Sequence, residues 1–376
     1  MRYNKFGNGW EISALSFGTG RLPTQGFNTY ALDEIASAKL IEEAIDGGIN
    51  YFDTAYIYNL GMCENFLGRT ITGAKRQKVR IATKMPVSII ESKKSMDAVL
   101  NKQLKRLNTD HIDFYLFHSL NRVSWEHLKK LEAIEWAERA KADGKIGEIG
   151  FSFHDEFAVF QDIISYHDKW GLCYIQFNYV DENSQAGIKG LELAYELGVP
   201  VIVMEPLKGG QLAKIPTEKV QNIWNKISGN KSHVDLALQW IWDHKQVSSL
   251  MSGISKQSDL KQNLAAADFA IPNSLTISER NVIDQVKNEL NKLSIIPCSK
   301  CNYCLPCPNG VYISGIFQFY NELVLHNNIE EKKLEYQFFP KELRANNCLA
   351  CGKCEMVCPQ GIKIVKWLKK IHNSLS

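Results

Sequence analysis

The sequence predicts an α/β protein in which a (β/α)8 TIM barrel is followed by a small α-rich domain. Short β-branched or aromatic runs alternate along the chain with stretches of helical period, which indicates parallel strands joined by helices. Eight such runs can be counted, and eight is the strand number of a TIM barrel. The residues after Pro297 differ, because they hold eight of the ten cysteines. We therefore expect one domain at residues 1–293 and a second at residues 294–376.

The expected strands are short and rich in β-branched or aromatic residues. They cover residues 14–18, 49–53, 79–84, 112–118, 146–151, 173–177, 199–204 and 247–252. The clearest helices between and after them are predicted at 32–46, 94–107, 125–142, 234–244 and, from the capping box Thr276-Ile-Ser-Glu279, 276–293. A doubly wound sheet is the alternative. No G-x-G-x-x-G follows an expected strand, however, so a nucleotide site of that type is not supported.

Composition is that of an ordinary soluble enzyme, with 376 residues, 45% hydrophobic and 23% charged residues and a net charge of +3. No basic stripe with interleaved aromatic residues is present, which argues against nucleic acid as a partner. No apolar run has the length of a membrane span. Residues 1–20 also lack the apolar core of a signal peptide. We therefore expect a cytoplasmic protein with neither nucleic-acid nor membrane partners.

Two runs of four cysteines are the strongest chemical signal in the chain. They are Cys298, Cys301, Cys304 and Cys307, and Cys348, Cys351, Cys354 and Cys358. Each run is followed by a proline, and the second reads C-x2-C-x2-C-x3-C-P, the ligand spacing of a bacterial-type [4Fe-4S] ferredoxin. Two [4Fe-4S] clusters are therefore predicted in a ferredoxin-like domain.

The ligand sets are expected to cross between the two runs, because in two-cluster ferredoxins the last cysteine of each run binds the other cluster. This rule assigns Cys358 to the first three cysteines of the first run, and Cys307 to the first three of the second. The first run departs from the pattern, since only Leu305 and Pro306 separate its last two cysteines. That short gap leaves open a single cluster together with a metal ion or a free pair.

Zinc and disulfide bonds are the alternatives for these cysteines. A four-cysteine zinc ribbon uses two C-x2-C pairs and not two unbroken runs of four. A disulfide framework is typical of secreted chains, and no secretion signal is found here. The remaining cysteines, Cys63 and Cys173, stand alone and are expected to be ordinary buried or partly buried thiols.

Four polar residues follow neighbouring strands of the expected barrel: Asp53, Tyr58, Lys84 and His118. Taken singly, each is more often structural, because an aspartate after a strand commonly caps a helix and a histidine after an apolar run is often a core residue. Active sites of TIM barrels lie at the C-terminal ends of the strands. An acid, a phenol, an amine and an imidazole at one rim therefore predict a site that donates a proton to a carbonyl group.

The chain resembles the aldo/keto reductase family, in particular the branch with a C-terminal [4Fe-4S] ferredoxin-type domain. The matching segments are FDTAYIY (52–58) with Gly61, Glu64 and Leu67-Gly68, IATK (81–84), DFYLFH (113–118), IGFS (149–152), IQFNY (175–179), MEPLKGG (204–210) and the stretch 252–263. These segments occur in the family's order along almost the whole barrel.

The resemblance implies an NAD(P)H-dependent oxidoreductase that interconverts a small carbonyl compound and an alcohol. Tyr58 would act as general acid/base and protonate the carbonyl oxygen while hydride reaches the carbon. A free phenol has a pKa of about 10. Lys84, held by Asp53, would lower that value for Tyr58, and His118 would hydrogen-bond the developing oxyanion.

The resemblance also implies a set of residues that bind NADP(H) or NAD(H). Ser152 and Gln176 would hold the carboxamide, Met204 stands where an aromatic ring often stacks on the nicotinamide, and Lys256 could hold a 2'-phosphate. The full set is Gly18, Thr19, Asp53, Ser152, Gln176, Met204, Leu207, Gly209, Gly253, Ser255, Lys256 and Asn263.

The presence of clusters in such an enzyme leaves three hypotheses open. Nicotinamide transfers two electrons as hydride whereas a cluster transfers one, and no flavin signature is present to connect them. In the first hypothesis the clusters stabilise or dock the second domain. In the second they exchange electrons with an external electron carrier. In the third the protein is an iron-sulfur relay or redox sensor whose barrel is a scaffold.

Overall fold

The computed structural model describes residues 1–6, 9–25, 31–214, 217–227, 231–293, 295–326, 333, 335–337 and 339–375. The chain forms two compact units, one of Met1–Pro206 with Leu238–Leu275 and the other of Leu207–Ala237 with Thr276–Ser376. Each unit therefore combines two segments that are separate in the sequence. The domain boundary after residue 293 stays a prediction, and residue 294 lies outside the described residues.

The first unit contains a closed barrel of eight parallel strands, in the order β10-β3-β4-β5-β6-β7-β8-β9, which confirms the predicted fold. The strands are β3 (Leu15–Gly18), β4 (Tyr51–Asp53), β5 (Arg80–Met85), β6 (Ile112–Leu120), β7 (Ile146–Phe153), β8 (Leu172–Gln176), β9 (Val201–Met204) and β10 (Val247–Gly253). The register pairs Gly18 with Asp53, Asp53 with Ala82 and Lys84 with Leu116, so the carboxyl ends of neighbouring strands meet at one rim.

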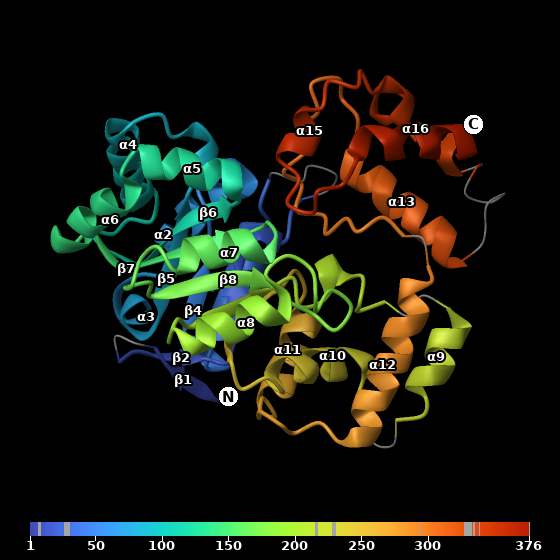
Figure 1. Ribbon diagram of the computed structural model, residues 1–376, viewed down its shortest axis with the longest axis horizontal. Coiled ribbons are helices and arrows are strands. Elements are labelled where there is room, and N and C mark those ends of the chain that lie inside the picture. The colour runs from blue at the N-terminus through green and yellow to red at the C-terminus, as the bar shows by residue number, and fades with distance from the viewer. Residues whose placement is uncertain are drawn as a thin grey trace. The chain divides into compact units, whose positions relative to one another are not determined.

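Helices follow the strands and surround the barrel (Figure 1). They are α1 (Glu34–Asp46), α2 (Met62–Thr70), α3 (Gly73–Lys78), α4 (Lys93–Arg106), α5 (Arg122–Lys130), α6 (Ala133–Ala142), α7 (Phe157–Ile164), α8 (Gly187–Glu196) and α11 (Gln257–Ala267). Helix α10 (His233–Trp242) begins in the second unit and ends in the first. The single helix predicted at 125–142 was wrong, because two helices occupy this stretch. Glu132 adopts a left-handed conformation with φ of 49°, which no α-helix can contain, and α5 ends before it.

A short antiparallel hairpin precedes the barrel and was not predicted. Its strands are β1 (Tyr3–Lys5) and β2 (Glu11–Ser13). Phe6 and Trp10, which lie between them, pack against Phe114 with ring centroids 5.9 and 5.2 Å apart. These rings join Tyr51, Tyr174 and neighbouring residues in the core.

The described residues of the second unit form helices and loops. It contains α9 (Glu218–Trp224), α12 (Ile277–Asn291), α13 (Ile313–His326), α15 (Lys353–Met356) and α16 (Ile364–Leu375). The capping box expected at Thr276 and Glu279 does begin α12. A separate hydrophobic core, which includes Ile316, Phe317 and Ile371, lies beneath the cysteine runs. Among the described residues, no helix is both long and apolar enough to cross a membrane.

Candidate active site and cysteine sites

Lys84 and Asp53 form a buried ion pair at the rim of the barrel. Strand β5 carries Lys84 and strand β4 ends in Asp53, and their side chains are 2% and 1% exposed. The Lys84 Nζ donates to Asp53 Oδ1 at 2.6 Å, to the Thr54 carbonyl oxygen at 2.8 Å and to the Tyr58 hydroxyl oxygen at 3.2 Å. An ammonium group has three protons. All three are directed to neighbours, which fixes the amine beside the phenol.

Tyr58 begins the short helix η2 (Tyr58–Gly61), whose tight turn orients the phenol. Gly61 has φ of 87°, a left-handed conformation that favours glycine at this position. The Tyr58 ring meets the His118 ring edge-on at 6.0 Å. The Lys84 Nζ lies 4.7 Å from the centroid of the Tyr58 ring. The structure thus brings the four predicted catalytic residues together.

Burial controls the protonation of these groups. It raises the pKa of Asp53 and lowers the pKa of Lys84, and the ion pair opposes both shifts. Burial, together with the positive charge of Lys84 and the neighbouring His154, holds the pKa of His118 well below its usual value. His118 is therefore a neutral imidazole near neutral pH.

Two buried tyrosines support Asp53, and sequence reasoning missed them. The Tyr174 hydroxyl donates to Asp53 Oδ2 at 3.0 Å, and the hydroxyls of Tyr51 and Tyr174 lie 2.7 Å apart. Both carboxylate oxygens of Asp53 are therefore engaged. Tyr51 stands two residues before Asp53, and Tyr174 two before Gln176, so strand alternation places each on the same face as a predicted site residue. That spacing was the available signal.

A second buried network holds the end of strand β5. Glu64 Oε1 accepts hydrogen bonds from Thr83 Oγ1 at 2.6 Å and from Gln103 Nε2 at 2.7 Å, while Oε2 accepts from Arg106 at 2.8 Å. Gln103 Nε2 also donates to the Lys84 carbonyl oxygen at 3.0 Å. The Glu64 carboxylate is fully buried. This network ties α2 and α4 to the strand that carries Lys84.

The residues predicted to hold the nicotinamide lie at the ends of neighbouring strands. Ser152, in β7, accepts a hydrogen bond from the Ser119 backbone N–H at 2.7 Å. Gln176 ends β8, donates to Asp181 at 3.1 Å and pairs in register with Met204. Gly18 ends β3, and Thr19 is buried directly after it.

The residues predicted for the phosphate and adenosine end are more scattered. Gly253 ends β10, and Ser255 and Lys256 are exposed before α11. Asn263 is buried and donates to Ser252 at 2.9 Å. Leu207 and Gly209 belong to the second unit, and their role in binding the dinucleotide stays a prediction. A Cβ on Gly209 would lie 2.3 Å from the Ser299 carbonyl oxygen within that unit.

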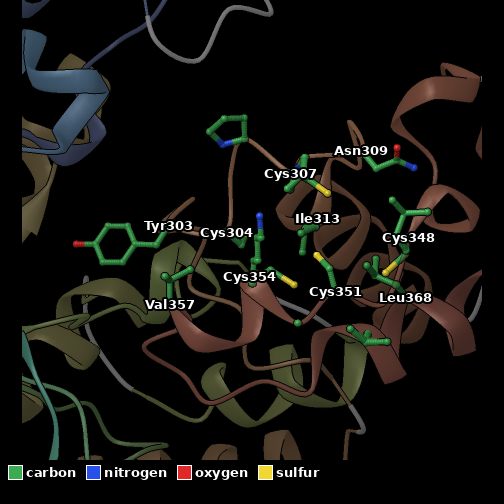
Figure 2. Close-up of a pocket in the computed structure, with 16 residues that line it drawn as sticks. Tyr303, Cys304, Cys307, Asn309, Ile313, Cys348, Cys351, Cys354, Val357 and Leu368 are labelled. Carbon is green, nitrogen blue, oxygen red and sulfur yellow. The ribbon is translucent and has the colours of Figure 1, made fainter. Parts of the chain in front are cut away.

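The eight clustered cysteines border two cavities in the second unit. Cys298, Cys301, Cys304 and Cys358 line one, which we call the inner site. Cys307, Cys348, Cys351 and Cys354 line the other, the outer site, a cavity of about 220 Å³ that Cys304 also borders. Figure 2 shows the sulfur atoms of the outer site turned toward a common space. The last cysteine of each run thus borders the same cavity as the first three of the other run, while the ligand sets themselves stay a prediction.

The donors of each site suit a cluster. A [4Fe-4S] cluster requires four thiolates around a body several ångströms wide. Within the described part of the chain, no three His, Cys, Asp or Glu side chains converge closely enough to hold a single metal ion. Burial, together with the nearby Cys348 and Cys307, raises the pKa of Cys354 to about 11. Thiolates at this position thus need a positively charged partner.

Comparisons with known proteins agree with this architecture. The profile of the aldo/keto reductase family matches residues 14–284, and the profile of a 4Fe-4S dicluster domain matches residues 297–362. An uncharacterized oxidoreductase, YrpG of Bacillus subtilis, is 26% identical over 317 residues, which cover 72% of this chain and 92% of YrpG. Methylglyoxal reductase YeaE of Escherichia coli is 27% identical, with 66% of this chain and 87% of YeaE covered.

Solved structures show the same barrel. The holo form of aldo-keto reductase AKR11C1 from Bacillus halodurans is 26% identical with a TM-score of 0.62, and the match covers 76% of this chain and 96% of that one. An aldo-keto reductase from Klebsiella pneumoniae in complex with NADPH shares the fold at 21% identity and a TM-score of 0.60, with 76% and 95% of the two chains covered.

Proposed function

Because this chain belongs to the aldo/keto reductase family, we propose that its barrel interconverts a small carbonyl compound and an alcohol by NAD(P)H-dependent hydride transfer, with Tyr58 as general acid/base. One observation carries the proposal. The Lys84 ammonium lies 3.2 Å from the Tyr58 hydroxyl and 2.6 Å from the Asp53 carboxylate, inside a buried site. This is the arrangement that a phenol needs to release a proton near neutral pH.

The protein residues manage one proton and one developing negative charge. A bound nicotinamide supplies the hydride. As the carbonyl oxygen gains charge, Tyr58 gives up its hydroxyl proton to it, and the ammonium of Lys84 stabilises the phenolate that remains. The neutral imidazole of His118 donates a hydrogen bond to the same oxygen. Asp53, engaged at both oxygens, keeps Lys84 charged and in place.

The dinucleotide would be held by the residues at the strand ends. Ser152 and Gln176 offer a hydroxyl and an amide for the carboxamide, and Met204 offers an apolar side chain for the nicotinamide ring. The exposed ammonium of Lys256 suits a 2'-phosphate. The K. pneumoniae neighbour was solved with NADPH, which makes NADPH the first dinucleotide to test.

The cysteine sites would each hold one [4Fe-4S] cluster, with the crossed ligand sets of the inner and outer sites. Two cavities, each bordered by at least four of the eight cysteines, support this count. Two clusters predict about eight iron atoms per chain in protein purified without oxygen, and one cluster predicts about four. Thiolate ligands also favour a reducing compartment, in keeping with the cytoplasmic location expected from the sequence.

The test of the proposed activity is NADPH and NADH oxidation with a panel of small aldehydes and sugars. Tyr58→Phe removes the proton donor and is expected to lower kcat by about 100-fold or more. Tyr56→Phe is the matched control, because its hydroxyl accepts from Lys102 at 3.1 Å and lies outside the Lys84 contacts. Full activity in Tyr58→Phe, measured with the substrate that the native protein turns over, would exclude the proposed role.

The second candidate function is an iron-sulfur electron-transfer or redox-sensing protein whose barrel is coupled to an external electron carrier. The cysteine sites favour it, since neither is needed for hydride chemistry. Binding of NADPH without turnover of any carbonyl substrate, together with clusters that accept electrons, would select this candidate over the first.

A further inference from the structure

The inner and outer cysteine sites differ in their exposure. The buried residues Phe317 and Ile364 line the inner site, while the buried Ile313 borders both sites. In the outer site, Cys351 is exposed, whereas the other seven cysteines of the two sites are partly buried. An electron can enter a cluster more readily through an exposed ligand than through a covered one. The outer site is therefore the accessible one of the two.

Large apolar side chains stand exposed around the outer site. Leu349 is 71% exposed, Met356 76% and Val357 45%. Leu349 and Val357 line the cavity itself, and Met356 adjoins Val357 at the end of α15. Apolar groups gathered in one place on a surface commonly mark a site where another molecule binds. Here they border the mouth of the outer site.

Lysines accompany these apolar residues. Lys353 lines the cavity, and Lys363, Lys366 and Lys369 lie on or just before α16, whose Val365 and Leu368 also line it. All four lysines are exposed, and none forms an ion pair with a described carboxylate. The carboxylate of Glu355, on α15, accepts a hydrogen bond from the Val365 backbone N–H at 2.8 Å. The surface is therefore positively charged around an apolar centre.

We propose that this surface, the outer-site face formed by Leu349, Cys351, Lys353, Met356, Val357 and the lysines of α16, docks an acidic one-electron carrier protein of the ferredoxin class. The proposal rests on the proposed cluster of the outer site. One electron passes from the reduced carrier to the oxidised cluster, so that the carrier is oxidised and the cluster reduced by one electron, with no bond made or broken. Complementary charge guides the approach, and the apolar centre provides the contact.

The test uses a reduced two-cluster bacterial ferredoxin of net negative charge as the probe. Reduction of the clusters is followed by stopped-flow absorbance without oxygen, at several salt concentrations. The variant Lys353→Glu/Lys366→Glu/Lys369→Glu is expected to lower the second-order rate constant by about tenfold or more at low salt. The difference should shrink at about 0.5 M salt, because ions screen exposed charges.

The matched control is Lys39→Glu/Lys130→Glu/Lys189→Glu, three exposed lysines on the barrel helices α1, α5 and α8. This variant has the same net charge and is expected to stay within about twofold of the native rate. Leu349→Ser tests the apolar contact, and it should slow the reaction about threefold at every salt concentration.

The outcomes separate the docking proposal from the cluster proposal. Normal iron content and normal reduction by dithionite, combined with a native ferredoxin rate in the Lys353 variant, would overturn the docking face alone. Equal slowing in the Lys353 and Lys39 variants would also overturn it, because net charge would then explain the effect. Protein that binds no iron under anaerobic conditions would overturn the clusters and the docking face together, while NADPH turnover would still report on the barrel.

Discussion

The rim of the barrel and the cysteine sites differ in whether contacts within the protein alone set the geometry of the site. At the rim, the polar groups form hydrogen bonds with one another. Lys84 donates three hydrogen bonds to protein oxygens, and both carboxylate oxygens of Asp53 accept hydrogen bonds. At the inner and outer sites, by contrast, at least four thiols line each cavity. The rim is thus a preorganised site encoded by the barrel itself, whereas the geometry of the cysteine sites depends on a ligand that the chain must bind.

The sharpest test of the preorganised rim is Lys84→Met. The change removes the cation between Asp53 and Tyr58, and we expect kcat/KM to fall by about 1,000-fold, because the phenolate then loses its stabilising charge. Lys102→Met is the control, since its Nζ donates to the Tyr56 hydroxyl at 3.1 Å. Cluster absorbance should remain native in both variants. A loss of less than about tenfold would show that the ion pair does not tune Tyr58.

The stability of the rim depends on the buried Glu64 network. Glu64→Gln leaves the Arg106 guanidinium, 14% exposed, without a charged partner, and we expect the free energy of unfolding to fall by about 3 kcal/mol. Urea unfolding of the barrel measures this loss. Glu138→Gln is the control, because Glu138 is 38% exposed and meets only His167, at 3.2 Å, so about 0.5 kcal/mol or less is expected. Equal losses in the two variants would contradict a special role for the network.

The cysteine sites should respond to removal of metal, in contrast to the rim. Oxidation and chelation of iron are expected to increase the rate of proteolysis within residues 297–375 by about tenfold, because the loops that carry the cysteines lose the group that joins them. NADPH-dependent turnover by the barrel should change by less than about twofold. Loss of both properties in parallel would show that the barrel also requires the clusters.

The sequence predicted the parts of the molecule that follow from periodicity and spacing. The strand ends were found in this way, and the structure brings Asp53, Tyr58, Lys84 and His118 together there. The supporting groups could not be found, because Tyr51 and Tyr174 look like ordinary strand residues until the barrel closes. The break between α5 and α6 was missed for a related reason, since it contains neither glycine nor proline. Both the contacts of the two tyrosines with Asp53 and the break between α5 and α6 depend on the folded structure and not on a local sequence signal.

The mildest test concerns the second oxygen of Asp53. Tyr174→Phe removes one hydrogen bond from the Asp53 carboxylate. The negative charge of Asp53 is then less stabilised by its neighbours, and it offsets more of the effect that the positive charge of Lys84 has on Tyr58. Tyr58 should then release its proton less readily. We expect kcat to fall about threefold, and the basic limb of the pH profile of carbonyl reduction to move to higher pH by up to about one unit.

Tyr51→Phe is the graded comparison, because its hydroxyl contacts Tyr174 at 2.7 Å and acts on Asp53 only through it. Its shift should have the same sign and be smaller than that of Tyr174→Phe. A purely structural role for the two tyrosines predicts a different result: lower stability with an unmoved pH profile. A shift of the pH profile therefore distinguishes electrostatic tuning of the rim from simple packing. Only tuning couples the buried hydroxyls to the proton of Tyr58.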